Sequence, residues 1–406
     1  MIRKVTGILL AILILAAGTS QAQHKLQAGV WRGVLKMPAG EVPFNFEVKN
    51  TGSKPEIAII NGAERFRVPD IKFYGDSVVI TMPLFDSEFH LKQEKNGSLN
   101  GKWVRHLGLS NAYIDFSATP NTTYRFLKVP AKAAFNVSGR WSAVFDSGSK
   151  RDTTVGEFKQ TGNELTGTFL TTTGDYRYLE GTVSGDKLYL SCFDGGHAFL
   201  FTATISNNQT LINGKFGSDS WTAVKNANAK LPDAYSLTSL KPGNKKLAFS
   251  FKDVNGKNVS LTDARFKNKV VIVQVMGSWC PNCMDETAYL VNYYKKYHPK
   301  GVEVVGLAYE RTTNFAQSKR TLTQLKNRFN IPYPLLITGY TPSKGDPAKS
   351  LPMLANFVAF PTTIIINKKG EVSKIHTGYS GPGTGQHYTA FVKEFEKLTD
   401  NLLAER

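Results

Sequence analysis

The sequence contains few cysteines, no segment of clustered like charges and no metal-ligand pattern. Only three of its 406 residues are cysteine, which excludes a small scaffold held together by disulfides. The net charge is +18, but the lysines and arginines are scattered and no nucleic-acid motif accompanies them. The seven histidines show no spacing typical of a metal site. The composition therefore predicts a globular protein without a metal or other cofactor and without a nucleic-acid partner.

The N-terminus is expected to be a cleaved signal peptide, residues 1–22. Arg3 and Lys4 precede an apolar run over residues 7–17, which is shorter than the roughly 20 residues needed to span a bilayer. Small residues then stand at the −3 and −1 positions of a cut after Ala22. No cysteine follows, so a lipoprotein anchor is excluded, and an uncleaved anchor is the alternative. Cleavage predicts a periplasmic or otherwise exported protein, in a compartment where disulfides persist.

Residues 23–228 lack helical periodicity and consist of short alternating runs separated by Asn-Gly turns, which predicts an all-β region. The region repeats, because the Gly-x-Trp pattern that ends at Trp31 returns at Trp141. Both tryptophans are expected to be core aromatics. The repeat predicts two duplicated β-sandwich or barrel units, residues 23–130 and 131–228, or alternatively two parts of one larger barrel.

The repeat also predicts the surroundings of single residues. Cys192 corresponds to Met82 or Leu84 of the first unit, and both are apolar, so we expect Cys192 to be a buried thiol. A regulatory or resolving role for Cys192 is the alternative. Asp86 and Asp194 also correspond to each other, and we expect both to accept hydrogen bonds within turns.

A linker over residues 229–243 leads to a region where strands and helices alternate, residues 244–406. We expect a hairpin over 249–261, strands near 270–276, 302–308, 333–337, 362–366 and 371–376, and helices near 280–297, 314–329, 347–356 and 388–403. This alternation predicts an α/β domain with a mixed sheet.

Two cysteines, Cys280 and Cys283, follow a β-branched strand and open the next expected helix. A thiolate that attacks a disulfide needs a second thiol nearby to resolve the mixed disulfide, and a helix N-terminus favours an anion. We therefore expect Cys280 to be the nucleophile and Cys283 the resolving cysteine of a redox-active disulfide. A structural disulfide is disfavoured because so small a loop gains little stability, and zinc is disfavoured because a second cysteine pair is lacking. Pro361, just before an expected strand, is the candidate for a cis peptide beside this pair.

The C-terminal region resembles exported thioredoxin-fold proteins of the TlpA/ResA type, also described as redoxin or AhpC/TSA-like. The resemblance is carried by Trp279-Cys280-Pro281-Asn282-Cys283, Glu286, Phe360-Pro361-Thr362 and residues 375–385. It covers about the last 165 residues. It implies a thiol–disulfide oxidoreductase with Pro361 in cis, and a substrate surface formed by Trp279, Pro281, Asn282, Phe360 and Thr362.

Glu286 matches the acidic residue that ResA-type proteins use to tune cysteine pKa values and to move protons. The alternative is an ordinary first-turn acid favoured by the helix dipole. Thioredoxins carry a buried aspartate six residues before the first cysteine, where this chain has Gln274. Glutamine cannot take up a proton, so Glu286 is the better candidate for that role.

The leading functional prediction is an exported reductase of protein or small-molecule disulfides, supplied with electrons by a membrane-embedded donor. An oxidant or isomerase on the same fold is the first alternative. A thiol peroxidase is the second, although Val273 and Met276, or Gly277, stand where its proline and threonine are expected. The third is a binding protein whose β-repeats dock a glycan, a membrane protein or another partner.

Overall fold

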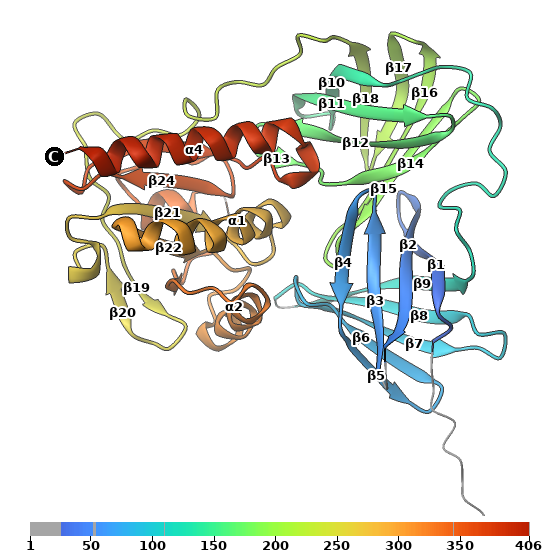
Figure 1. Ribbon diagram of the computed structural model, residues 1–406, viewed down its shortest axis with the longest axis horizontal. Helices are drawn as coiled ribbons and strands as arrows, with labels where there is room; N and C mark the ends of the chain where they lie inside the picture. Colours follow the sequence, from blue (N-terminus) through green and yellow to red (C-terminus); the bar gives the residue numbers. More distant parts are fainter. Residues whose placement is uncertain (1–25, 52–53, 109, 344, 406) are drawn as a thin grey trace, which may run out of the picture.

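The structure is a computed structural model that describes residues 26–51, 54–108, 110–343 and 345–405. The expected signal peptide lies outside these residues. Two β-barrels lie side by side, and an α/β domain packs against both of them (Figure 1). Among the helices described, none combines the length and apolarity needed to cross a bilayer.

The first barrel is a nine-stranded antiparallel sheet in the order β4-β3-β2-β1-β9-β8-β7-β6-β5. Its strands are β1 (Gly29–Met37), β2 (Gly40–Thr51), β3 (Lys54–Asn61), β4 (Glu64–Val68), β5 (Asp70–Tyr74), β6 (Ser77–Thr81), β7 (Ser87–Gln93), β8 (Leu99–His106) and β9 (Asn111–Pro120). Because β1 pairs with both β2 and β9, the first and last strands meet inside the sheet. The two end strands of the sheet, β4 and β5, are neighbours in the chain.

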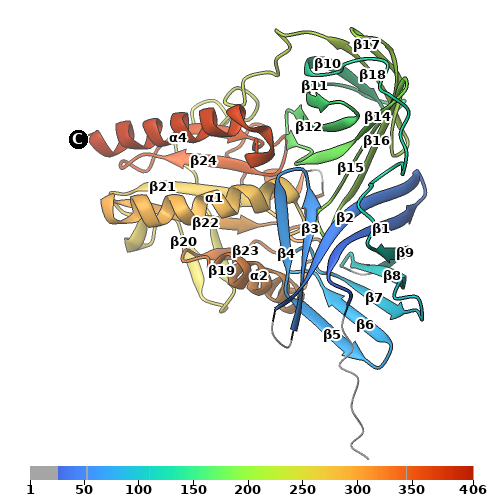
Figure 2. The ribbon, with the colours of Figure 1, turned by 45° about the vertical axis from the view of Figure 1, so that its right-hand side comes forward.

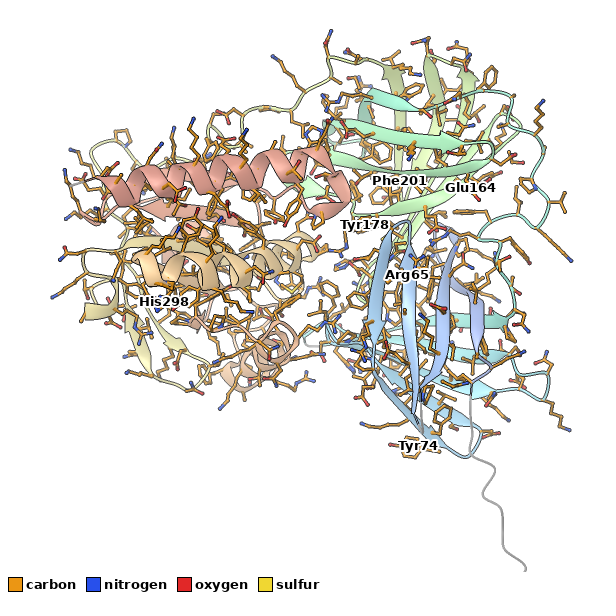
Figure 3. The ribbon with its side chains drawn as sticks, in the orientation of Figure 1. Arg65, Tyr74, Glu164, Tyr178, Phe201 and His298 are labelled. Atoms are coloured by element: carbon orange, nitrogen blue, oxygen red, sulfur yellow. The ribbon has the colours of Figure 1, made fainter. Side chains whose placement is uncertain are left out.

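The second barrel repeats this arrangement in the order β11-β10-β18-β17-β16-β15-β14-β12-β13, and a further pairing of β11 with β12 closes it. Its strands are β10 (Gly139–Asp146), β11 (Arg151–Thr161), β12 (Glu164–Thr171), β13 (Gly174–Asp175), β14 (Leu179–Ser184), β15 (Lys187–Phe193), β16 (Ala198–Asn207), β17 (Thr210–Phe216) and β18 (Asp219–Lys225). Each unit thus has its own barrel-like sheet, and the alternative of one larger barrel is wrong. Phe201 lies inside the second barrel and Tyr74 at the far tip of the first (Figure 3).

The two barrels open in the same way. Trp31 and Trp141 are both fully buried, and each indole Nε1 donates to the carbonyl four residues earlier at 2.8 Å. Gly29 and Gly139 both have φ +117°, a conformation that residues with a Cβ rarely adopt. The expectation that both tryptophans are core aromatics is confirmed. Cys192 is also fully buried in the second barrel's core, as expected.

The C-terminal domain is built on a seven-stranded mixed sheet in the order β20-β19-β23-β22-β21-β24-β25. Its strands are β19 (Ser250–Asp253), β20 (Asn258–Ser260), β21 (Val270–Met276), β22 (Val302–Ala308), β23 (Leu335–Ile337), β24 (Thr362–Ile366) and β25 (Val372–Thr377). Its helices are α1 (Pro281–Tyr297), α2 (Phe315–Phe329), α3 (Asp346–Ser350) and α4 (Gln386–Ala404), with 3₁₀ turns η1 (Ala264–Phe266), η2 (His298–Lys300) and η3 (Pro382–Thr384). Strands β21, β22 and β23 run parallel and the other pairings are antiparallel.

Alternate residues of the central strands face two separate cores. Ile272 and Val304 pack with the buried residues of α1, α2 and α4, whereas Val271 and Val305 pack on the opposite face with Phe266 and its neighbours. The sheet is therefore covered on both faces, as the near-continuous apolar strands require.

Helix α3 is shorter than the sequence predicted. It ends at Ser350, and Leu351 has φ −125° and ψ 69°, outside the helical region. Pro352 follows, and the residue before a proline is sterically hindered from the α conformation. The expected helix over 347–356 therefore continues as a loop.

Candidate active site

The cysteine pair lies where strand β21 passes into helix α1. Cys280 is the N-cap residue of α1, and its Sγ accepts a hydrogen bond from the backbone N–H of Cys283 at 3.3 Å. Both cysteines are free thiols, and Cys280 is 4% exposed while Cys283 is fully buried. The Cys280 thiol donates to the carbonyl oxygen of Phe360 at 3.7 Å, and the Phe360–Pro361 peptide bond is cis. Cys280 is therefore the slightly accessible thiol of the pair, and Cys283 is the buried one.

A buried carboxyl group lies behind the pair. Glu286 is 1% exposed; its Oε2 accepts from Gln274 Nε2 at 2.8 Å and its Oε1 from Thr363 Oγ1 at 2.6 Å. Burial raises the pKa of Glu286 to about 7, and the two hydrogen bonds oppose this shift only in part. An ordinary first-turn acid would be solvated, whereas Glu286 is buried. With a pKa of about 7, this carboxyl can take up or release a proton near neutral pH.

Gln274 connects this carboxyl to the cysteines. Its Nε2 also donates to the Cys283 carbonyl at 3.3 Å, and its Oε1 accepts from Thr287 at 3.2 Å. The pKa of the Cys283 thiol is raised well above its usual value, first by burial, then by Cys280, and further by the charge of Glu286. A thiol with so high a pKa would need a proton acceptor before it could act as a nucleophile, and the Glu286 carboxyl is close enough for its charge to raise that pKa further.

The comparisons with known proteins agree with this geometry. Residues 241–390 match the family model described as Redoxin. These residues form a Redoxin domain. The chain is 27% identical over 158 residues to the thiol-disulfide oxidoreductase ResA of Bacillus subtilis, which covers 39% of this chain and 79% of ResA. The resemblance to TlpA/ResA-type proteins and the thioredoxin-like fold are confirmed for this domain, which is a thioredoxin-like oxidoreductase.

Two further relatives cover the same region. The thioredoxin-like protein YneN of Bacillus subtilis is 29% identical over 130 residues, 32% of this chain and 68% of YneN. The crystal structure of a thiol:disulfide interchange protein of the thioredoxin family from Chlorobium tepidum aligns with a TM-score of 0.31 and 20% identity, over 41% of this chain and 100% of that chain.

The expected substrate surface is only partly exposed in the Redoxin domain. Trp279 is half-buried, donates from Nε1 to the Tyr309 carbonyl at 2.8 Å, and packs against Phe360 at 5.5 Å between ring centroids. Pro281 is half-buried beside the cysteines. The placement of Thr362 on this surface is wrong: it is fully buried at the start of β24, and its hydroxyl donates to the Ala359 carbonyl at 2.7 Å.

Asn282 is half-buried and faces the second barrel. With its amide oriented to satisfy both groups, its nitrogen donates to the Asp175 carbonyl at 3.1 Å and its oxygen accepts from the Asp175 N–H at 3.2 Å. The Asp175 carboxylate accepts from Gly381 N–H at 2.7 Å. A Cβ on Gly378 would lie 2.8 Å from the Thr172 carbonyl, so only glycine fits there. The β12–β13 hairpin thus binds the amide of Asn282, and the expected contact of this residue with substrate stays a prediction.

One buried arginine joins all three parts of the molecule. Arg177, between β13 and β14, donates to Asp285 of α1 at 2.5 Å and to Glu64 of β4 at 2.6 Å. The three side chains are 7%, 16% and 14% exposed. Burial lowers the pKa of Arg177, but the two carboxylates outweigh it and the net pKa is raised. Tyr178, next in the chain, lies at the same junction (Figure 3).

The first barrel lies next to α2 of the Redoxin domain (Figure 2). Arg320 of α2 binds both carboxylate oxygens of Asp86, at 3.1 and 2.7 Å. The expected turn role of Asp86 is therefore wrong for its side chain, which forms an ion pair between domains. Asp194 does accept turn hydrogen bonds, from Gly196 N at 2.9 Å and His197 N at 2.7 Å, as expected.

The loop before Trp279 is anchored by a glutamate that the sequence did not single out. Glu310 is buried and accepts from the backbone N–H of Ser278 at 2.8 Å, from the Ser278 hydroxyl at 2.6 Å and from Thr321 at 3.0 Å. The distance in sequence between Glu310 and the cysteines did not indicate this anchoring role, because Glu310 follows the neighbouring strand β22. Within the described part of the chain, no group of three or more His, Cys, Asp or Glu side chains is arranged to hold a metal ion.

Proposed function

We propose that this protein is an exported thiol–disulfide oxidoreductase that reduces protein disulfides through a Cys280/Cys283 dithiol–disulfide cycle. The observation that carries the proposal is the position of Cys280 as the N-cap of α1, with Cys283 buried beneath it and Glu286 hydrogen-bonded through Gln274 behind both. The printed activity of the ResA relatives, thiol-disulfide oxidoreductase, supports it.

The proposed reaction transfers two electrons from the enzyme to the substrate. The Cys280 thiolate attacks one sulfur of the substrate disulfide, forming a mixed disulfide and releasing one substrate thiolate. Cys283 then gives its proton to Glu286 and attacks Cys280 Sγ, which forms the Cys280–Cys283 disulfide. The second substrate thiolate leaves and takes up a proton. A dithiol donor must afterwards return both electrons, and we propose a membrane-embedded one.

The Phe360 carbonyl and Pro361 contribute to the shape of the protein surface beside Cys280. The carbonyl oxygen lies 3.7 Å from Cys280 Sγ, next to the sulfur that a substrate disulfide must reach. Pro361 is buried, and it has no N–H that would compete for the thiolate. We propose that these two residues, with Trp279 and Pro281, form the contact surface for the substrate chain.

Insulin reduction with dithiothreitol as the electron source tests the cycle. Cys280→Ala should abolish turnover, Cys283→Ala should accumulate a mixed disulfide, and Cys192→Ala should retain activity because that thiol is buried in the second barrel. Activity in Cys280→Ala would contradict the proposed nucleophile. A redox titration against glutathione separates a reductase from an oxidant, since thioredoxin lies at about −270 mV and DsbA at about −120 mV.

Export and domain organisation are proposals of the same kind. Fractionation of cells that produce the full chain should recover a mature protein that begins at Gln23 outside the cytoplasm. We propose as domain limits residues 23–130 and 131–228 for the barrels, 229–243 for the linker and 244–406 for the Redoxin domain. Because both barrels contact the surroundings of the cysteine pair, we propose that they shape access to it.

A further inference from the structure

A cavity of about 550 Å³ lies between the two barrels. One wall comes from the β1–β2 hairpin and the end of β8 in the first barrel, and the other from β16 and the turn that joins β17 to β18. Strand β2 lies alongside β15 and β16 in this region (Figure 2). Sites for small ligands typically have volumes of roughly 300–1,000 Å³, so the cavity is large enough for one. The apolar side chains that line it include Met37, Val42, Ala198, Phe199, Leu200 and Phe216.

Contacts between the barrels hold the two walls of this cavity together. Phe193, at the end of β15, packs in the core of the first barrel, with its ring 5.1 Å from that of Trp103. The N–H of Phe193 donates to Asn61 Oδ1 at 3.2 Å, and its carbonyl accepts from Asn61 Nδ2 at 2.9 Å. At the β1–β2 hairpin, a Cβ on Gly40 would lie 3.3 Å from the Leu200 side chain. The cavity is therefore preformed, which lowers the cost of ordering the protein around a ligand.

One arginine lines this apolar cavity without a partner for its charge. Arg105 is half-buried, and its guanidinium lies 5.1 Å from the centroid of the Trp103 ring. Within the described part of the chain, Arg105 forms no hydrogen bond and no ion pair, whereas Arg125 and Arg177, which also lie between the barrels, each pair with a carboxylate. Burial is the main reason why the pKa of Arg105 is lowered. A partly desolvated and unpaired charge is unfavourable, and a bound anion would offset this cost.

The wall of the cavity presents no carboxylate that would compete for Arg105. Neither aspartate nor glutamate is among the described residues that line it. Asp194 is close enough for its charge to raise the pKa of Arg105, but it is 1% exposed and engaged in its own turn. Its Oδ1 accepts from the N–H groups of Gly196 and His197, and its Oδ2 lies 3.2 Å from His197 Nδ1. The cavity therefore combines apolar walls with one available positive charge.

We propose that this cavity binds a fatty acid, with its carboxylate on Arg105 and its hydrocarbon chain along the apolar side chains of both barrels. A guanidinium group binds a carboxylate through two parallel hydrogen bonds, and stacking on Trp103 holds its plane in place before binding. A peptide fits the cavity less well, because each of its residues would bring an N–H and a carbonyl group against apolar side chains. A hydrocarbon chain needs no hydrogen bonds. The inference is independent of the proposed reductase function.

Isothermal titration calorimetry of the full chain with laurate tests the site, and we expect laurate to bind at a single site. Octanoate, which has a shorter chain, should bind at least about tenfold more weakly, since each buried methylene contributes about fourfold to the affinity. Dodecyltrimethylammonium has the same chain length as laurate but a cationic head, which Arg105 would repel, so it should also bind at least about tenfold more weakly. The absence of laurate binding, or equal affinities for laurate and dodecyltrimethylammonium, would overturn the inference.

Two variants of the cavity wall and one control locate the bound molecule. Arg105→Gln should weaken laurate binding about tenfold, the loss typical of a hydrogen bond to a charged group, and Leu200→Asn should weaken it by disturbing the apolar wall. Arg328→Gln is the matched control, because Arg328 of α2 is also half-buried and stacks at 5.4 Å on a ring of the first barrel, that of Phe66, outside this cavity.

The control variant should bind laurate as the wild type does. Equal losses in Arg105→Gln and Arg328→Gln would overturn the inference, because the overall positive charge would then explain the binding. If the acetylated tripeptide Leu-Phe-Leu bound to the wild type more tightly than laurate, the cavity would be a peptide site and the inference would be wrong.

Discussion

Gln274 Nε2 donates to Glu286 Oε2 at 2.8 Å, and the same nitrogen lies 3.3 Å from the Cys283 carbonyl. The glutamine thus stands where thioredoxins place a buried acid, yet it acts as a donor that orients an acid from the next helix. Moving the carboxyl from strand β21 to helix α1 keeps a proton acceptor buried beneath the pair. In the proposed mechanism, proton transfer during the resolving step therefore depends on Glu286.

Glu286→Gln should slow the resolving step by about a hundredfold, the size typical of a lost general base. In the wild type the decay of the mixed disulfide should accelerate as pH rises through about 7, because Glu286 becomes an acceptor there. The variant should lack that step while Cys280 still forms the mixed disulfide. Rapid quench between pH 5 and 9 measures both rates. Glu303→Gln, which alters a buried carboxyl of β22 that faces His298, is the control and should behave as the wild type.

The same carboxyl should make stability depend on pH. Its pKa is raised in the folded protein from 4.5 to about 7, so folding favours the protonated form. This contribution to stability is complete below pH 4.5 and is lost as pH rises through 7. Glu286→Gln keeps the neutral form at every pH, so the variant should match the wild type at pH 4 and exceed it in stability at pH 8. Urea unfolding of both proteins gives the difference, and a difference that does not change with pH would contradict this account.

Sequence patterns predicted those parts of the candidate site whose residues lie close together in the chain. The strand, the cysteine pair and the helix start lie within one short stretch, and Pro361 could be matched by its place before a strand. The burial of Trp31 and Trp141 could be predicted because the internal repeat places each tryptophan at the start of its barrel. The contacts of Arg177 with Asp285 and of Asn282 with Asp175 could not be predicted from the sequence, because they join residues more than a hundred positions apart. Thr362 was misplaced because the motif gave its position but not the face of β24 to which its side chain points.

Arg177→Met should destabilise the molecule by about 3 kcal/mol, because it leaves Glu64 and Asp285 as unpaired carboxylates at a buried junction. Arg320→Gln removes a second arginine pair of the Redoxin domain with a barrel, but the Arg320 side chain is 58% exposed, so it should cost less than about 1 kcal/mol. Chemical unfolding followed by circular dichroism gives both values. Similar losses in the two variants would show that the junction at Arg177 is solvated in solution.

Asn282→Ala should loosen the β12–β13 hairpin without changing the affinity for substrate. The Asn282 amide makes two hydrogen bonds to the main chain of Asp175, so its removal leaves that N–H and carbonyl without their partner. Amide hydrogen exchange should therefore speed up over residues 172–175, while exchange in β24 stays as in the wild type. Thr173→Ala is the control, because its exposed side chain bonds only to Thr171 within the hairpin. If the KM for a peptide disulfide rose while exchange over 172–175 stayed slow, Asn282 would contact the substrate and the hairpin would have to leave the active site during turnover.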